Sequence, residues 1–594
     1  MTSASRTAAP ATARRSALAV IALLVVSACA GIPSSGPVSK VADDGGLGES
    51  TVRYSPARPA EGASPQQIVR GYLDAMLAYP VSTGTATAFL TPEGEKGWNP
   101  SAGVRVYSLV GLSGPTLAAG ESGEGGETTD KTRDPVEVET RLVLDARLDQ
   151  QGHYTRQAGP GNVTYRLERV KGEWRITNPQ DGLLVNRKFF DDYYRSFNIF
   201  YFDRPGRRVV PDPVHAVVGE QLATTLVTSL ARGPATSARG ATRTYVPRLR
   251  SLRPSVPVSD DGIADVEFTT DFAAMSESAQ NHLSAQIVWT LRQVPDVSSV
   301  RLAGGTTVLS NSDRTTQDVS SWRSFGPRGA RGHAYAIADD RVVQIDESTV
   351  KRLSGAWGQD ARGAVAVGVS DAGVAGVLRG RNLVRVTNRQ GTDARTFGGS
   401  QLLTPRWDDD GSVWLLDRQA GRTRARLVTG DRIRTLGIGG LARLDVRTFA
   451  LSPDGSRYAA TVRGVGGTSL RVGWVERDTK DRVLGLGDPT SVFTPATAPR
   501  SVTWSSGTDV SYLAETQTGR QVHTTAIDGS STSGGLSRDG ALLPDVGATD
   551  LAVGTGETPA RYATDARRRL WFLPAGQSWQ LLSARGVTGL TYGS

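Results

Sequence analysis

The stretch Trp407-Asp408-Asp409-Asp410-Gly411, followed by Val413-Trp414-Leu415-Leu416, decides how the C-terminal half of this chain folds. Aspartates and a glycine after an aromatic residue predict a tight turn, because aspartate accepts backbone hydrogen bonds and glycine adopts positive φ. The apolar residues that follow are typical of a buried strand. The stretch therefore predicts a strand, a polar turn and a second strand.

The same pattern recurs along the chain from about residue 321. Copies stand at Val369–Gly373, Leu451–Gly455 and Trp504–Gly507, and a degenerate copy stands at Thr564–Arg567. They are roughly 40 to 60 residues apart, which suits one four-stranded blade each. A lone blade cannot bury both of its faces, so blades stack around an axis. Together with Tyr335–Asp340, the copies predict a β-propeller of about six blades over residues 318–594.

The aspartates of these turns are also candidate calcium ligands. Asp408-Asp409-Asp410-Gly411, however, lacks the alternating oxygen ligands and the distal glutamate of an EF-hand loop. None of the five histidines stands at metal-ligand spacing; they are His153, His215, His282, His333 and His523. We expect neither a metal nor a cofactor.

The sequence offers no convincing catalytic constellation. A Gly-x-Ser-x-Gly elbow, a phosphate loop and a dinucleotide fingerprint are all missing from the contexts in which they function. Propeller hydrolases such as lactonases gather His, Asp or Glu on the axis, and this propeller contributes only two histidines, His333 and His523. We predict that the protein is not an enzyme, with a propeller hydrolase as the less favoured alternative.

An α+β unit is predicted over residues 203–312. Its expected elements are a helix at 216–230, strands at 251–258 and 263–268 around Asp260-Asp261-Gly262, a helix at 276–291 and a strand at 297–302. Four of its segments are similar to the GerMN domain of spore-germination and envelope lipoproteins: 230–234, 262–268, 289–291 and 294–297.

Residues 63–200 predict a further domain. Ser64-Pro65 begins a helix by serine capping, and Gly71 within it indicates close packing against a neighbour. Strands are expected at 104–110, 136–148 and 163–176, with Trp174 facing a cone-shaped core. A helix followed by a curved antiparallel sheet resembles the NTF2-like fold, whose enzymes carry an Asp and His pair. Only His153 is available here, so we expect a binding or spacer role.

The first residues predict export and lipidation. Arg6, Arg14 and Arg15 precede the apolar run Ala17–Val26, and Val26-Ser27-Ala28-Cys29 matches a lipobox. At ~1.5 Å per residue, this run of about ten residues is too short to cross a ~30 Å hydrocarbon core. We therefore expect a signal peptide at 1–28, cleaved between Ala28 and Cys29. Cys29, the only cysteine, then carries a diacylglyceryl thioether and an N-acyl chain.

Two other interpretations of this segment stay open, namely an ordinary secretory signal and a short membrane anchor. Residues 29–62 lack an apolar period and predict a flexible tether. The formal net charge of +9 favours anionic headgroups or cell-wall polymers, and nucleic acid is not expected outside the membrane. The predicted location is the extracytoplasmic face of the cell membrane.

The order of lipid anchor, tether, NTF2-like domain, GerMN-like domain and propeller resembles the LpqB family of actinobacterial lipoproteins. The opening stretch Cys29-Ala30-Gly31-Ile32-Pro33-Ser34-Ser35-Gly36-Pro37 is similar to that family as well. The resemblance implies a non-enzymatic protein that binds the extracytoplasmic sensor region of the MtrB histidine kinase. It would thereby modulate two-component signalling in envelope and division control. A binding module for a cell-wall polymer is the first alternative.

Overall fold

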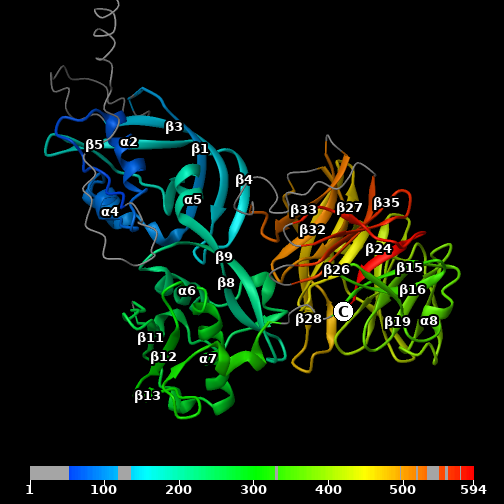
Figure 1. Cartoon of the computed structure of the whole chain (residues 1–594). Coiled ribbons are helices and arrows are strands. Elements are labelled where there is room, and N and C mark those ends of the chain that lie inside the picture. Colours follow the sequence, from blue (N-terminus) through cyan, green and yellow to red (C-terminus); the bar gives the residue numbers. More distant parts are fainter. Residues whose placement is uncertain are drawn as a thin grey trace, which may run out of the picture. The chain divides into compact units, whose positions relative to one another are not determined.

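The computed structural model describes residues 53–594, apart from 115, 118–134, 254, 328–331, 495–496, 517–518, 531–546, 556–558, 575–576 and 594. The predicted signal peptide, Ala28, Cys29 and most of the tether lie outside the described residues. The chain from Arg53 onward forms one compact unit, in which three domains follow one another (Figure 1). Within the described ranges, no helix is long and apolar enough to cross a membrane.

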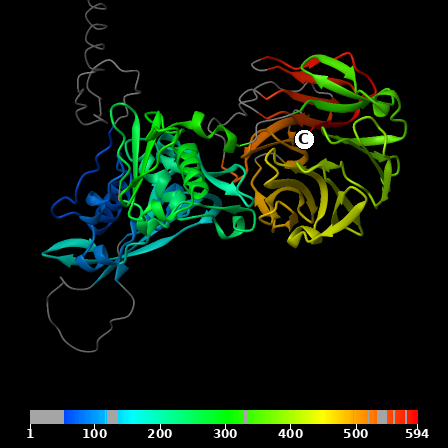
Figure 2. The same cartoon turned by 90° about the horizontal axis from the view of Figure 1, so that it is seen from below.

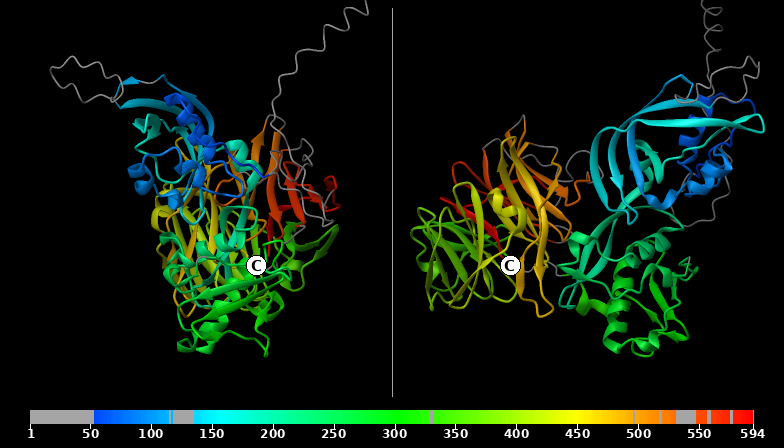
Figure 3. Two further views of the ribbon diagram at one scale, coloured as in Figure 1. Left: turned by 90° about the vertical axis from the view of Figure 1, so that its left-hand side faces the viewer. Right: turned by 180° about the vertical axis from the view of Figure 1, so that it is seen from behind.

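The first domain places short helices beside a bent sheet, as its sequence predicts (Figure 3). Its helices are α2 (Pro65–Ala75), α3 (Gly84–Thr87), α4 (Pro92–Gly97) and α5 (Arg187–Tyr193). Its strands are β1 (Val104–Leu112), β2 (Thr116–Leu117), β3 (Val136–Leu148), β4 (Tyr154–Pro160), β5 (Val163–Val170), β6 (Glu173–Ile176) and β7 (Leu183–Asn186). The main path of the sheet is β6-β5-β3-β1-β7, and only β1 and β7 pair in parallel.

Local chemistry explains the start of this domain. The Ser64 hydroxyl accepts the Gln67 N–H while the Gln67 side chain accepts the Ser64 N–H, so the predicted cap is confirmed. A Cβ on Gly71 would lie 2.5 Å from the Phe89 ring, which confirms the close packing expected there. Trp174 is partly buried and packs against this core with the Arg169 guanidinium over its ring, so the prediction that it faces the core is confirmed. The assignment to the NTF2-like fold stays a prediction.

The second domain begins earlier than its sequence indicates. The core residues Ile199 and Phe200 of β8 (Tyr194–Asp203) pack with the second domain rather than the first. The other strands are β9 (Val209–Val217), β10 (Thr242–Arg243), β11 (Ile263–Phe268), β12 (Ser299–Gly304), β13 (Thr307–Val308) and β14 (Thr316–Gln317). The helices are α6 (Leu222–Ala231) and α7 (Glu277–Leu291).

Two predictions for this domain need correction. The helix expected from residue 216 begins at Leu222, because β9 pairs with β8 as far as Val217. The strand expected at 251–258 is reduced to two single bridges to β11, whose other edge pairs in parallel with β12. Helix α7 starts where Ser276 caps it, and this prediction is confirmed.

The third domain is a β-propeller, which confirms the predicted architecture. Among the described residues, six sheets follow one another between Ala334 and Tyr592. Figure 2 shows these sheets arranged around an axis. The first sheet combines β15 (Ala334–Ala338), β16 (Arg341–Asp346) and β17 (Thr349–Arg352) with the last strand, β38 (Thr588–Tyr592). Pairing of β15 with β38 closes the ring.

The remaining sheets each use consecutive strands. The second and third sheets contain β18 (Ala364–Val369), β19 (Val374–Leu378), β20 (Leu383–Thr387), β21 (Arg395–Gly398), β22 (Arg406–Trp407), β23 (Val413–Gln419), β24 (Arg422–Thr429) and β25 (Arg432–Leu436). The fourth contains β26 (Asp445–Leu451), β27 (Arg457–Gly464), β28 (Gly467–Arg477), β29 (Val483–Leu486) and β30 (Thr490–Val492). The fifth and sixth contain β31 (Thr497–Trp504), β32 (Asp509–Thr516), β33 (Gly519–Ala526), β34 (Ala548–Val553), β35 (Arg561–Asp565), β36 (Leu570–Leu573) and β37 (Gln580–Leu581), and helix α8 (Ala356–Gln359) joins the first two sheets.

The order of the strands within each sheet also corrects where the repeated turns lie. The copies at Val369–Gly373, Leu451–Gly455 and Trp504–Gly507 follow innermost strands, as Trp407–Gly411 does. The copy at Thr564–Arg567 follows the second strand of its sheet, β35, and therefore lies at the opposite end of the propeller. The turn at Asp339-Asp340 also follows a second strand, because β38 takes the innermost place in that sheet.

Candidate functional site

The turns that follow the innermost strands meet at one end of the propeller and surround a cavity of about 190 Å³. Every sheet contributes to its lining, from Ser370–Ala372 in the second sheet to Tyr592 and Gly593 in the first. The recurring turns that follow innermost strands are thus the walls of one cavity, whereas Asp339-Asp340 and Thr564–Arg567 lie at the other end. The sequence predicts each turn but not their convergence.

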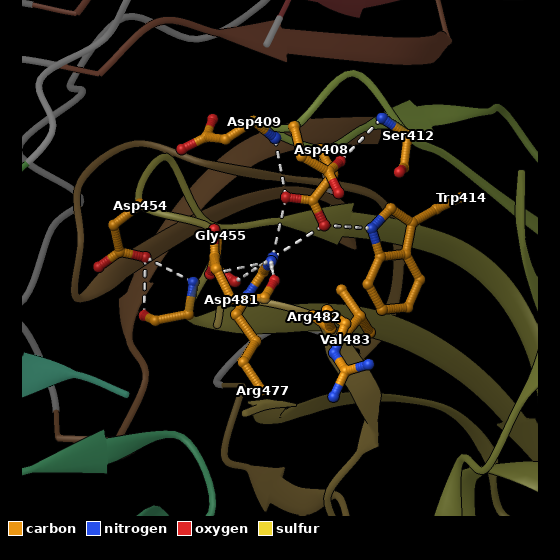
Figure 4. Close-up of polar contacts among 12 residues, drawn as sticks. Asp408, Asp409, Ser412, Trp414, Asp454, Gly455, Arg477, Asp481, Arg482 and Val483 are labelled. Carbon is orange, nitrogen blue, oxygen red and sulfur yellow. Dashed lines mark hydrogen bonds and ion pairs between the residues drawn. The ribbon is translucent and has the colours of Figure 1, made fainter. Parts of the chain in front are cut away.

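Asp408 holds the wall of the third sheet together (Figure 4). Its carboxylate accepts the indole N–H of Trp414 at 2.9 Å and two bonds from Arg477 Nη2 at 2.8 and 2.9 Å. The side chains of Asp408 and Arg477 are 1% and 8% exposed. Both carboxylate oxygens are therefore occupied by donors of the protein, and this aspartate serves the blade rather than a metal ion.

Arg477 also connects the cavity wall to the second domain. Its Nη2 donates to the carbonyl of Gly455, another residue of the cavity lining, at 3.3 Å. Its backbone N–H donates to the Gly240 carbonyl at 3.4 Å. Its neighbour Asp481 forms an ion pair with Arg207 of the second domain. One buried arginine thus touches two turns of the cavity and the neighbouring domain.

A second buried arginine makes a similar connection from the next strand. Arg457 is 2% exposed, and it donates to the Pro211 carbonyl at 2.7 Å and to Asp212 Oδ1 at 3.1 Å. Its backbone N–H donates to the hydroxyl of Ser452, which lines the cavity. Burial lowers the pKa of Arg457, and the Asp212 charge opposes that shift.

Asp212 continues this chain of charges into the first domain. Its Oδ2 lies 3.1 Å from Nε2 of His153, whose Nδ1 lies 3.0 Å from Asp149 Oδ2. Burial alone would lower the pKa of His153, but the hydrogen bonds and charges of the two carboxylates outweigh it and raise the pKa to about 10. His153 is therefore an imidazolium at neutral pH that joins two domains, and in this state it is not available as a general base.

His215 occupies a different environment on the same strand, β9. Its Nδ1 lies 3.7 Å from Oδ2 of Asp528 in the propeller, too far for a hydrogen bond, and both atoms are buried without a partner. Burial lowers the pKa of His215, against the opposing charge of Asp528. The ring of His215 also packs between Tyr154 and Phe190 of the first domain.

The other histidines do not join these clusters. The ring of His282 stacks on Tyr245, and its Nε2 lies 2.7 Å from the carbonyl oxygen of Gly206. The ring of His523 stacks on Tyr512. The carbonyl of His333 accepts the N–H of Gly593 at the cavity, but its ring lies 3.8 Å from Asp346. Among the residues with described positions, no three His, Cys, Asp or Glu side chains form a group that could hold a metal ion.

Sequence reasoning missed three residues of the site. Asp212 and Arg457 form the ion pair between the second and third domains, and Arg406 lines the cavity. Asp212 stands in Val210-Pro211-Asp212-Pro213, where the prolines suggest a loop. The segment instead belongs to strand β9, which pairs with β8. Arg457 follows the predicted turn at Leu451–Gly455, and the available signal was an arginine in front of the apolar residues Tyr458-Ala459-Ala460. Ala28 and Cys29, the predicted cleavage and lipidation residues, lie outside the described part of the chain.

Three protein families match consecutive parts of the chain. Residues 58–191 match the family described as Lipoprotein LpqB, N-terminal domain, and residues 340–589 match Lipoprotein LpqB beta-propeller domain. Residues 198–307 match the family described as Sporulation and spore germination. The three matches follow the order of the three domains.

Curated relatives extend this similarity across the chain. Lipoprotein LpqB of Streptomyces avermitilis is 26% identical over 95% of this chain and 95% of its own length. Lipoprotein LpqB of Streptomyces coelicolor is 26% identical over 96% of both chains. Lipoprotein LpqB of Thermobifida fusca is 29% identical over 66% of this chain and 64% of its own length.

Proposed function

Because the chain belongs to the LpqB family of lipoproteins, we propose that it binds the extracytoplasmic sensor region of an MtrB-type histidine kinase. In this role it modulates two-component signalling in envelope and division control. The protein is held at the outer face of the cell membrane by the lipidated Cys29. The first domain acts as an NTF2-like spacer and binding module.

The observation that carries this proposal is the fixed connection among the three domains. The chain Asp149–His153–Asp212–Arg457 joins all three through buried or half-buried charged groups. Groups locked in this way hold surfaces in a constant arrangement, which favours recognition of a protein of defined shape. Such an arrangement supports binding more than hydrolysis, since the histidine nearest to two carboxylates is committed to them.

Lipidation supplies the second part of the mechanism. An anchor confines the protein to the membrane surface and so raises its effective concentration near a kinase in the same membrane. A protein that binds one signalling state of the kinase more tightly than the other shifts the population toward that state. The free energy by which it shifts the equilibrium between the two kinase states then equals the difference between its binding free energies for those states.

Crosslinking in intact membranes, followed by mass spectrometry, tests the proposal. We expect the wild-type protein to yield crosslinks to the extracytoplasmic region of the kinase. A Cys29→Ser variant should be released by high-salt and carbonate washing and should lose these crosslinks. Recovery of wall glycan without the kinase would refute the proposal and favour polymer binding, to which the net charge of +9 is suited. A Cys29→Ser protein that resists washing would refute the lipid anchor.

A further inference from the structure

Arg406 presents an unused donor to the cavity at the end of the propeller. It lies on the innermost strand β22 and belongs to the cavity lining. Its Nε donates to the Phe449 carbonyl at 3.0 Å and its Nη1 to the Thr591 hydroxyl at 2.6 Å, which together fix the plane of the guanidinium. Its Nη2 donates to no described residue, so one side of the planar fork stays available to a ligand.

The charge of Arg406 is poorly compensated. Burial lowers the pKa of Arg406 to about 10, and the carboxyl of Asp550 opposes that shift. Burial in turn raises the pKa of Asp550, whereas the charges of Arg381 and Arg406 lower it, and no hydrogen bond joins Asp550 to Arg406 within the described residues. A guanidinium with a free edge binds a carboxylate better than any other common protein group. The inner part of the cavity is therefore suited to a carboxylate.

The outer part of the cavity has the opposite sign. Asp371 and Asp409 line the cavity and are exposed. Asp371 has no hydrogen bond or ion pair with the described part of the chain. Negative charge at the rim repels a polyanion and attracts a cation. A ligand that matches both the inner part and the rim of the cavity has a carboxylate at the end that enters the cavity and a basic group at the end that stays near the rim.

The walls between these charges are aromatic and fixed. The indole of Trp407 donates to the Gly368 carbonyl at 2.9 Å, and that of Trp504 to the Ala450 carbonyl at 3.2 Å. With their indole N–H groups used and only 5% and 3% of Trp407 and Trp504 exposed, the two rings offer only a narrow apolar edge to a ligand. The volume of about 190 Å³ is below the roughly 300–1,000 Å³ of pockets for drug-sized ligands, so a short chain segment fits better than a helix.

We propose that this cavity binds a short peptide segment of the partner protein, with a carboxylate at Arg406 and a basic residue near Asp371 and Asp409. The carboxylate belongs to an acidic side chain or to a chain terminus. The inference rests on the proposed function, because it takes the partner to be a protein. It adds the place of contact and the charge pattern that the partner must carry.

Affinity for the purified sensor region of the kinase tests the cavity with matched variants of the full lipoprotein in detergent. Ala372 is exposed in the lining, and Ala566 is exposed in the turn at the opposite end. We expect Ala372→Trp to weaken binding at least tenfold and Ala566→Trp to leave it unchanged. Arg406→Gln should weaken binding at least tenfold while Arg406→Lys weakens it less. Equal affinity of the two tryptophan variants would overturn the inference.

A photo-crosslinking residue at position 372, introduced into the protein in membranes, separates the cavity from the identity of the partner. The expected product joins position 372 to a kinase segment containing Asp or Glu, and its yield falls with Arg406→Gln. Kinase crosslinks from other positions but none from 372 would overturn the cavity and leave the proposed function intact. A product with an acidic segment of another protein, lost with Arg406→Gln, would support the cavity and refute the kinase. Displacement by poly(glycerol phosphate) would overturn the peptide assignment.

Discussion

Removal of the Asp212 carboxylate is the most informative perturbation of the junction among the domains. In an Asp212→Ala protein, Arg457, whose side chain is 2% exposed, keeps the Trp474 ring but only the Pro211 carbonyl as a hydrogen-bond acceptor among the described residues. His153 keeps only Asp149 among the described side chains. Loss of one partner from a buried ion pair costs about 3–5 kcal/mol, because a charge remains buried without compensation. We therefore expect the Asp212→Ala substitution to weaken the contacts between the domains by about 3–5 kcal/mol.

Hydrogen exchange at single amides measures this cost where it arises. The His215 N–H donates to the Gly152 carbonyl at 2.8 Å across the first boundary, and the Arg477 N–H donates to the Gly240 carbonyl across the second. At about 1.4 kcal/mol per tenfold change, both amides should exchange about 10²- to 10⁴-fold faster in the variant. Amides in the centre of the propeller should keep their rates.

Asp417 provides the matched control. It is a carboxylate with a side chain 2% exposed, and it bonds Arg424 and Arg426 within one sheet of the propeller. Asp417→Ala should destabilise that sheet without changing exchange at His215 or Arg477. If Asp212→Ala leaves both reporter amides within threefold of the wild-type rate, or if Asp417→Ala accelerates them equally, the junction does not depend on this chain of charges.

Three further outcomes are expected. The folded-state pKa of His153 is raised to about 10 from the ordinary 6.5. The stability that its charge contributes is therefore complete below pH 6.5 and is lost as pH rises through 10. Thermal unfolding of the His153→Gln variant, measured from about pH 6 to 10, should lack this alkaline decline. Asp408→Ala leaves Arg477 and the Trp414 indole without their buried acceptor and should cost about 3–5 kcal/mol in calorimetry of the propeller, whereas Trp414→Phe should cost about 1.5–3 kcal/mol. Deletion of Thr588–Tyr592 removes the partner of β15 and should convert the propeller to a protease-sensitive state; a deletion variant as resistant as the wild type would contradict closure by β38.

The junction and the cavity share structural elements, which gives binding a route to the other domains. The turn from Ser452 to Gly455 lines the cavity, and Arg457, two residues after Gly455, bonds Asp212. Oδ1 of Asp454 accepts bonds from Ser452 and Ser456 and so holds this turn in shape. A ligand that moves the turn therefore acts on a charge shared by all three domains.

Local signals in the sequence were sufficient for several elements. A capping serine with a proline after it placed the start of α2, because helix ends depend on side chains within a few residues. The recurring Asp and Gly turns identified the propeller, because turn chemistry and strand alternation repeat in every blade. The helix expected at 216 failed for the opposite reason, since pairing with β8 decided the conformation as far as Val217.

The sequence by itself determined the lipobox pattern, the order of domains and the kind of third domain, because each of these depends on residues close together in the chain. Only the tertiary structure decided that Thr564–Arg567 lies at the end opposite to the other copies, because the strand before it, β35, pairs as the second strand of its sheet. Only the tertiary structure placed His153 between Asp149 and Asp212, with Arg457 behind them, and Arg406 inside the cavity. Asp149 and His153 are only four residues apart, but Asp212, Arg406 and Arg457 come from distant parts of the sequence, and only the folded protein brings them to these positions.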